Sequence, residues 1–188
     1  MLKRTAFVLM VLVLALAVPA AAQDENYPVS GQIALLGYVI PPQLICNGPG
    51  ADPCADPKHV VGRGSVQTWI PAGSEWVPGW WDSVFGPGET LAGPDSELLY
   101  GQITFIVNCN FSPAYKGPCW GTFQWATPDP NAIWVGTWTS PLMDLASYES
   151  VISMVGHGVG GAIDGKQLKV DGFSDPGDWY IMFKARIK

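Results

Sequence analysis

Among the titratable side chains of the sequence, His157 has the setting most typical of a catalytic group. It lies between two glycines at the end of an alternating apolar segment, and the same alternation places Glu149 on its face of the strand. A histidine in this position can reach the mouth of a cavity, and Asp164 and Asp171 follow nearby. A His–carboxylate pair can act as general acid and base, so the catalytic candidates are His157, Glu149 and Asp171. The simpler interpretation, which we favour, is an exposed turn histidine with solvated carboxylates.

The sequence contains none of the common catalytic motifs. There is no Gly-x-Ser-x-Gly elbow, no His-Glu-x-x-His pair and no phosphate-binding loop. Residues 156–161 match the letters of Gly-x-Gly-x-x-Gly, but a dinucleotide site requires a helix directly afterwards, whose N-terminus binds the pyrophosphate. Here residues 162–165 lead into a turn and a further strand. We therefore predict no cofactor and lean towards a protein that is not an enzyme.

Tryptophan is the residue type that points to ligand binding. The segment 71–97 has no strand rhythm and holds four aromatic residues among prolines and glycines. A long irregular loop in a compact domain is usually functional or disordered, and aromatic side chains need to be covered. The loop therefore acts either as a plug over one end of the domain or as a lid whose tryptophans contact a ligand. The candidate ligand-binding residues are Trp80, Trp81, Trp125, Trp134 and Trp138, although for the last three we favour ordinary core, since large aromatics fill barrels well.

The four cysteines predict two disulfides rather than a metal site. Cys46 and Cys54 flank a turn-forming segment, and Cys109 and Cys119 flank another loop that contains proline and glycine. Of the three possible pairings we favour these two local ones, each of which should stabilise the fold by roughly 2–3 kcal/mol by restricting the unfolded chain. A metal site needs closer Cys-x-x-Cys spacing or nearby histidines, and the chain has only two histidines.

Residues 1–22 have the layout of a cleavable export signal. A basic start at Lys3 and Arg4 precedes the apolar run 6–18, and small residues follow up to Ala22. The run is shorter than the roughly 18 residues that span a bilayer, so we expect cleavage near Ala22, no membrane anchor afterwards, and a secreted or periplasmic protein of bacterial type. Residues 23–188 then form one domain with eight basic and sixteen acidic side chains. This negative charge argues against nucleic acid as a partner.

Apolar residues alternate with a period of two along most of the domain, which predicts an all-β fold. The last segment is the clearest, because Ile181, Phe183 and Ala185 share one face while three cations share the other. Glycines recur inside the strands, where they permit the bending that a small closed barrel demands. We therefore predict a single antiparallel barrel of about eight strands, with a β-sandwich as the alternative. The expected strands are 29–39, 60–70, 99–107, 121–125, 134–138, 148–157, 166–173 and 179–187.

One glycine-rich hairpin resembles a known family. It contains Gly156, Gly158 and Gly165, and with its flanking strands it covers about residues 118–188. This part of the chain resembles the allene oxide cyclase and dirigent-type barrels, although that family usually carries an aromatic residue where this chain has Gly160. The resemblance implies a small exported or plastid barrel of eight strands. For function, the resemblance implies a cyclase or isomerase that uses His157 or Asp171.

The sequence leaves several functions open and does not determine the oligomeric state. The first is a non-catalytic barrel that binds a small apolar or aromatic ligand, the second a carbohydrate-binding module, and the third a cyclase or isomerase. A structural or partner-binding role is a fourth. An interior filled by Trp125, Trp134, Ile181 and Phe183 would argue against the first function, whereas an open interior lined by them would support it.

Overall fold

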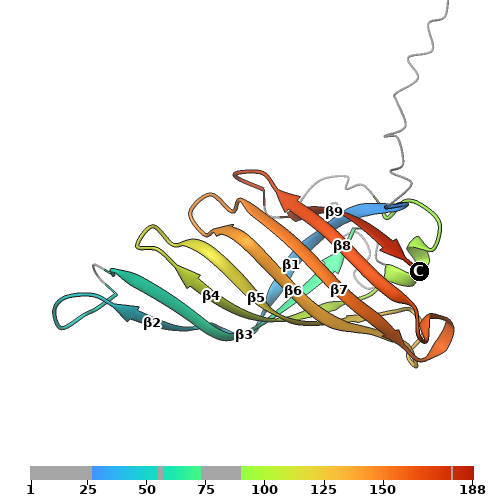
Figure 1. Ribbon diagram of the computed structural model, residues 1–188, viewed down its shortest axis with the longest axis horizontal. Coiled ribbons are helices and arrows are strands. Elements are labelled where there is room, and N and C mark those ends of the chain that lie inside the picture. The colour runs from blue at the N-terminus through green and yellow to red at the C-terminus, as the bar shows by residue number, and fades with distance from the viewer. Residues whose placement is uncertain (1–26, 55–56, 73–89, 179) are drawn as a thin grey trace, which may run out of the picture.

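The chain folds into one antiparallel sheet of nine strands, described by a computed structural model for residues 27–54, 57–72, 90–178 and 180–188 (Figure 1). The strands are β1 (Val29–Ile40), β2 (Gln43–Asn47), β3 (His59–Pro71), β4 (Ile103–Phe111), β5 (Lys116–Ala126), β6 (Ile133–Asp144), β7 (Ser150–Val159), β8 (Gln167–Ser174) and β9 (Tyr180–Ile187). Two short 3-10 helices, η1 (Ser96–Leu99) and η2 (Gly161–Ile163), lie in the connections. In the part of the chain described here, no helix has the length and apolar character needed to cross a membrane.

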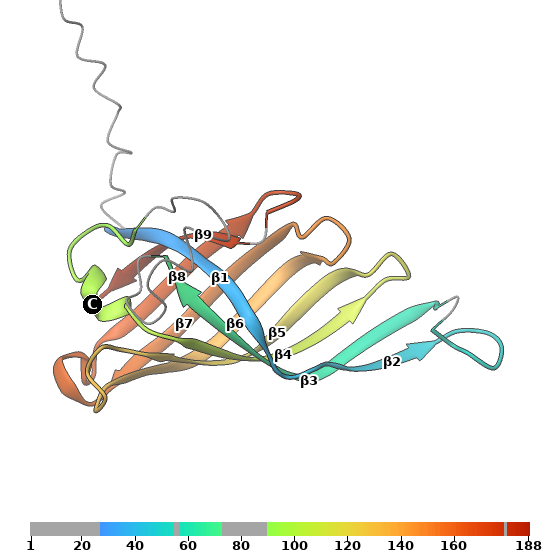
Figure 2. The same cartoon turned by 180° about the vertical axis from the view of Figure 1, so that it is seen from behind.

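Eight of the strands close into a ring. Their order is β1-β9-β8-β7-β6-β5-β4-β3, and β1 pairs with β3 to complete the circle (Figure 2). This confirms the predicted all-β, antiparallel ring of about eight strands. The strands are not spaced evenly round one axis, so the ring has features of both a barrel and a sandwich. All eight expected strands are present, while β2 is an additional strand and β4 begins later than expected because η1 precedes it.

Strand β3 has two partners along one of its edges. Its first half pairs with β2 and its second half pairs with β1. Pro41 and Pro42 separate β1 from β2, because proline offers no N–H group to the ladder. β2 and the first half of β3 project from the ring as an arm (Figures 1 and 2). The disulfide Cys46–Cys54 closes the chain at the end of this arm.

Both predicted disulfides are confirmed. Cys46 and Cys54 have a Cα–Cα distance of 5.1 Å, and Cys109 and Cys119 one of 4.1 Å. The second pair lies directly opposite on β4 and β5, so it links two neighbouring strands of the ring.

The interior of the ring is filled by aromatic side chains that stand opposite glycines. The four aromatic residues concerned, Phe123, Trp134, Trp138 and Phe183, are each at most 3% exposed. The direct cross-strand pairs are Trp138 with Gly121, Trp134 with Gly158, Phe123 with Gly136, and Phe183 with both Gly172 and Gly31. An added Cβ would lie 3.0 Å from the ring of Trp138 at Gly121 and 2.8 Å from that of Phe123 at Gly136, and at Gly158 and Gly172 it would meet Ile163 and Ile181. The glycines that we expected for bending therefore also make room for the core.

Each interior tryptophan has a partner for its indole N–H. Trp125 and Trp134 donate to carbonyl oxygens of η1, at 2.9 Å and 3.0 Å, and Trp138 donates to the carbonyl of Ile106 at 3.1 Å. Trp125 also packs edge to face against Phe183, with the ring centroids 5.8 Å apart. Trp125 and Trp134 thus attach η1 to the ring from inside, and Trp138 links β6 to β4.

Replacing Gly121 by alanine should destabilise the fold. The new Cβ would overlap the carbonyl oxygen of Ile106 and crowd the indole nitrogen of Trp138. We expect the free energy of unfolding, measured by urea denaturation, to fall by roughly 1–3 kcal/mol. Gly37→Ala is the matched control in β1, because a Cβ there meets no atom within 4 Å and should change stability by less than about 0.5 kcal/mol. Equal effects of the two substitutions would contradict this role of Gly121.

Candidate ligand-binding groove

Four side chains from four neighbouring strands form a row across the outer face of the ring. Trp120 on β5 lies opposite Thr139 on β6, Thr139 lies opposite Ser153 on β7, and Ser153 lies opposite Asp171 on β8. They share this face because the residues next to them along the strands, such as Cys119, point into the core. With neighbouring strands about 4.8 Å apart, the row is about 14 Å long.

An open groove with a volume of about 590 Å³ is lined by this row together with Pro118, Pro141 and Val151. It lies where β6 bulges, because Ser140 and Pro141 together stand opposite the single residue Ile152 of β7. A hydrogen bond from Ser140 Oγ to the carbonyl of Leu142 spans the bulge. A bulge bends its strand locally, which places the groove at this point of an otherwise regular sheet.

Trp120 provides the aromatic surface of the groove and is 37% exposed. One face of its ring is covered by the guanidinium of Arg63, which lies 5.2 Å from the ring centroid. A cation in this position is attracted by the electrons of the indole and limits the orientations of the ring. The neighbouring residue Cys119 is fixed by its disulfide to β4. The indole is therefore held in place while part of its surface stays accessible.

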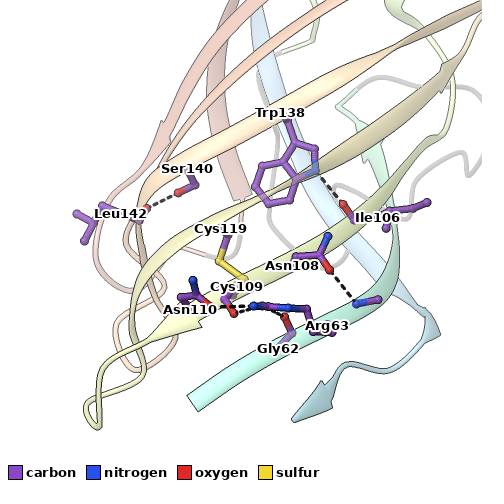
Figure 3. The surroundings of a disulfide bond; sticks show 11 residues. Gly62, Arg63, Ile106, Asn108, Cys109, Asn110, Cys119, Trp138, Ser140 and Leu142 are labelled. Carbon is purple, nitrogen blue, oxygen red and sulfur yellow. Dashed lines mark hydrogen bonds between the residues drawn. A yellow bond between two sulfur atoms is a disulfide. The ribbon is translucent and has the colours of Figure 1, made fainter. Parts of the chain in front are cut away.

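Arg63 is itself held by three hydrogen bonds. Its guanidinium donates to the carbonyls of Gly62 and Cys109, at 2.8 Å and 2.7 Å, and to the side chain of Asn110 at 3.0 Å. Figure 3 shows these bonds beside the disulfide Cys109–Cys119. Arg63 can reach them because β3 bulges here, with Arg63 and Gly64 both standing opposite Asn108. Gly64 has a φ of 64°, a conformation that favours glycine.

Asp171 provides the charged end of the groove. Ser153 Oγ donates a hydrogen bond to its carboxylate at 2.7 Å, the hydroxyl of Tyr27 donates another, and Lys169 Nζ lies 3.2 Å away. Partial burial alone would raise the pKa of Asp171. The hydrogen bonds from Tyr27, Ser153 and Lys169, with the positive charge of Lys169, outweigh this effect and hold the pKa below its ordinary value.

Tyr27 joins Asp171 to two cations. Its ring lies 5.3 Å from the Lys169 ammonium and 5.5 Å from the Arg186 guanidinium. Hydrogen bonds to Tyr27 and Asp171, and the charge of Asp171, raise the pKa of Lys169. The carboxylate of Asp171 thus stays ionised and in a fixed position, where it can accept hydrogen bonds from a ligand.

The structure does not assemble the catalytic candidates into one site. His157 is exposed on the outer face of β7, opposite Val135 and Gln167. Asp171 lies opposite Ser153, four residues along the strand from His157, which corresponds to about 13 Å. Glu149 is eight residues away, or about 26 Å, and pairs with Lys116 at 3.5 Å. Of the three candidates, only Asp171 belongs to the groove.

The tryptophans proposed from the sequence fall into two groups. Trp125, Trp134 and Trp138 are buried in the interior, and Ile181 and Phe183 fill the same cluster. Trp80 and Trp81 lie outside the described residues. The exposed Trp120 was missed, although a signal for it exists. In the alternation of β5 the residues Phe123 and Trp125 point inward, so Trp120 has the opposite phase and must face outward.

Among the described residues, no group of three His, Cys, Asp or Glu side chains is arranged to hold a metal ion. Comparisons with protein-family models, with curated proteins and with solved structures found no match to this chain. The resemblance of residues 118–188 to allene oxide cyclase and dirigent-type barrels therefore stays a prediction.

Replacing Tyr27 by phenylalanine should raise the pKa of Asp171, because it removes a hydrogen-bond donor to the charged carboxylate. An NMR titration of the Asp171 carboxyl carbon measures this directly. Tyr115→Phe, on the turn between β4 and β5, is the matched control and should leave that pKa unchanged.

The same substitution should have a pH-dependent effect on stability. A carboxyl group whose pKa is lower in the folded than in the unfolded state stabilises the fold above about pH 4, and this contribution disappears as the pH falls through the folded pKa. The loss of stability in Tyr27→Phe should therefore shrink in acid. An unchanged pKa of Asp171 in this variant would contradict the assignment.

Proposed function

We propose that this protein is an exported, non-catalytic binding protein that binds carbohydrate through the outer groove. The observation that carries the proposal is the exposed, fixed indole of Trp120 in line with two hydroxyl groups and an ionised carboxylate. A sugar ring has an apolar C–H face that stacks on an indole and hydroxyl groups that need hydrogen-bond partners. The row offers both kinds of contact along its length.

The form of the groove favours a sugar over a wholly apolar ligand. Sites for apolar ligands are usually enclosed and bury most of the ligand surface, whereas this groove is open. The alternative of an apolar ligand inside the ring requires a hollow interior. The cluster that contains Trp125, Trp134 and Phe183 leaves these rings fully packed by protein.

Export is part of the proposal. Residues 1–22 read as a cleavable signal, and the two disulfides are of the kind that forms and persists outside the reducing cytoplasm. Because polysaccharides are abundant at the cell surface and beyond it, an exported protein meets this class of ligand.

The placement of the candidate residues supports a non-catalytic role. Proton transfer between His157 and either Glu149 or Asp171 requires hydrogen-bond contact, directly or through one water molecule. The separations of about 26 Å and about 13 Å along the strands are far larger than that. Asp171, the one candidate in the groove, is occupied by Tyr27, Ser153 and Lys169 and serves to hold a ligand.

Replacing Trp120 by alanine should abolish most of the carbohydrate binding. Loss of such an aromatic contact typically weakens the binding free energy by about 2 kcal/mol, which raises Kd roughly thirtyfold. The measurement is affinity electrophoresis on a panel of soluble polysaccharides, followed by calorimetry with oligosaccharides of the one that binds.

Phe173→Ala is the matched control for this substitution. Phe173 is an exposed aromatic residue on β8 that does not line the groove, so its variant should bind as tightly as the wild type. Retention on none of the polysaccharides, or equal binding by the Trp120 and Phe173 variants, would refute the proposal.

A further inference from the structure

Three positively charged side chains lie together on the outer face of β8 and β9, next to the groove. Lys169 on β8 stands opposite Arg186 on β9, and Lys184, two residues before Arg186, stands opposite Asp171. All of these side chains point outward, because the residues that alternate with them along both strands are buried. We call Lys169, Lys184 and Arg186 the cationic cluster.

The positive charge of this cluster is only partly balanced by its surroundings. On the outward phase of β8 and β9 the one acidic residue is Asp171, which pairs with Lys169 at 3.2 Å. The strands on either side, β7 and β1, contain no acidic residue. Among the described residues, neither Lys184 nor Arg186 forms an ion pair. Two positive charges are therefore available to a ligand.

The cluster also continues the row of groove residues. Trp120, Thr139, Ser153 and Asp171 stand opposite one another on β5 to β8, and the exposed Lys184 is the next member of this row, on β9. Measured along the sheet, the extended row is about 19 Å long. It begins with an aromatic surface, continues with two hydroxyl groups and a carboxylate, and ends with an ammonium group.

We propose that the carbohydrate bound in the groove carries an anionic group, a carboxylate or a sulfate, on the ring that lies at the β9 end. This inference rests on the proposed carbohydrate binding and specifies its ligand. A neutral ring stacks on Trp120, and the anionic group of a ring further along the row contacts Lys184 and Arg186. Ammonium and guanidinium groups form their strongest hydrogen bonds with such anions.

The carboxylate of Asp171 is compatible with an anionic ligand. It accepts hydrogen bonds from Tyr27 and Ser153 and pairs with Lys169, so its charge is already compensated. Its remaining acceptor capacity suits a sugar hydroxyl. The anionic group of the ligand lies beyond it, at the two cations with which Asp171 forms no ion pair.

The distribution of charge along the chain restricts where such an anion can bind. Residues 23–165 contain three basic and thirteen acidic side chains, whereas residues 166–188 contain five basic and three acidic ones. Two of those three, Asp175 and Asp178, lie in the turn between β8 and β9, at the end of β9 away from Arg186. Most of the chain therefore repels an anion, and the cluster attracts it. This pattern suits a sugar chain with its anionic group at one end of the groove better than a polyanion that lies across the whole molecule.

The test compares three forms of one polysaccharide: the form that contains uronic acid, its carboxyl-reduced neutral form, and a sulfated derivative of the neutral form. Binding is measured by affinity electrophoresis and by calorimetry at low salt. We expect at least one anionic form to bind about tenfold more tightly than the neutral form, because it gains two exposed ion pairs. The form that gains shows whether the group is a carboxylate or a sulfate. The difference should shrink as salt is added.

Replacing Lys184 by glutamine should weaken binding of the anionic form about threefold and leave the neutral form unchanged. Lys184→Arg should keep the preference, and Lys184→Gln combined with Arg186→Gln should remove it. Lys58→Gln is the matched control, since it makes the same change of charge at an exposed position before β3 and should affect neither form. Trp120→Ala should weaken both forms by the same factor.

Equal affinity for the neutral and anionic forms would overturn this inference and leave the proposed function standing. A preference for the anionic forms that the double variant retains would have the same consequence. Equally tight binding of single-stranded DNA or of anionic lipid vesicles would show attraction to any anion and would also overturn the inference. Binding to none of the three forms would refute the proposed function and this inference together.

Discussion

The fold depends on the fit between aromatic rings and glycines inside a closed ring of strands. Trp138 can donate to the carbonyl of Ile106 because Gly121, opposite it, has no side chain. The same arrangement recurs at Phe183, which has glycines on both neighbouring strands. Closing the ring joins β1 to β3, and the interior then has to be filled without strain. Large rings beside glycines fill this space, and the described interior residues are buried.

Trp125, Trp134 and Trp138 belong to the core, so among the described residues of these strands the candidate binding surface is formed by side chains that face outward. Trp120 is one of them, and it differs from a randomly exposed tryptophan because Arg63 and the disulfide Cys109–Cys119 fix it. A side chain that is ordered before a ligand arrives loses less entropy on binding, which is the physical value of such support.

How much of this could be predicted depends on the range of the interactions. The alternation of β9 and the turn-forming segments between the paired cysteines are local, so eight of the nine strands and both disulfides could be predicted, whereas closure of the ring rested on the glycines, with a β-sandwich as the alternative. The groove rests on contacts between distant residues: Arg63 reaches Cys109 across 46 positions, and Tyr27 reaches Asp171 across 144. The alternation along a strand shows which residues face outward, but it does not show which of them lie beside one another on different strands. His157 and Glu149 are a different case: they share a face of one predicted strand, but eight residues of extended chain separate them by about 26 Å.

The bulges explain why the unpredicted features occur where they do. In a regular ladder each strand would continue flat past its neighbours. The extra residues at Arg63 and Gly64 turn β3 so that the guanidinium reaches Trp120, and the bulge of β6 at Ser140 and Pro141 lies at the groove. Two further register shifts in β1, near Leu36 and Val39, come where it crosses from β9 to β3 and leaves β2 as a free edge. A bulge changes the phase of alternation by one residue, which disturbs the pattern that a sequence reading relies on. The bulges thus lie beside the candidate site, while the row from Trp120 to Asp171 itself occupies regular ladder positions.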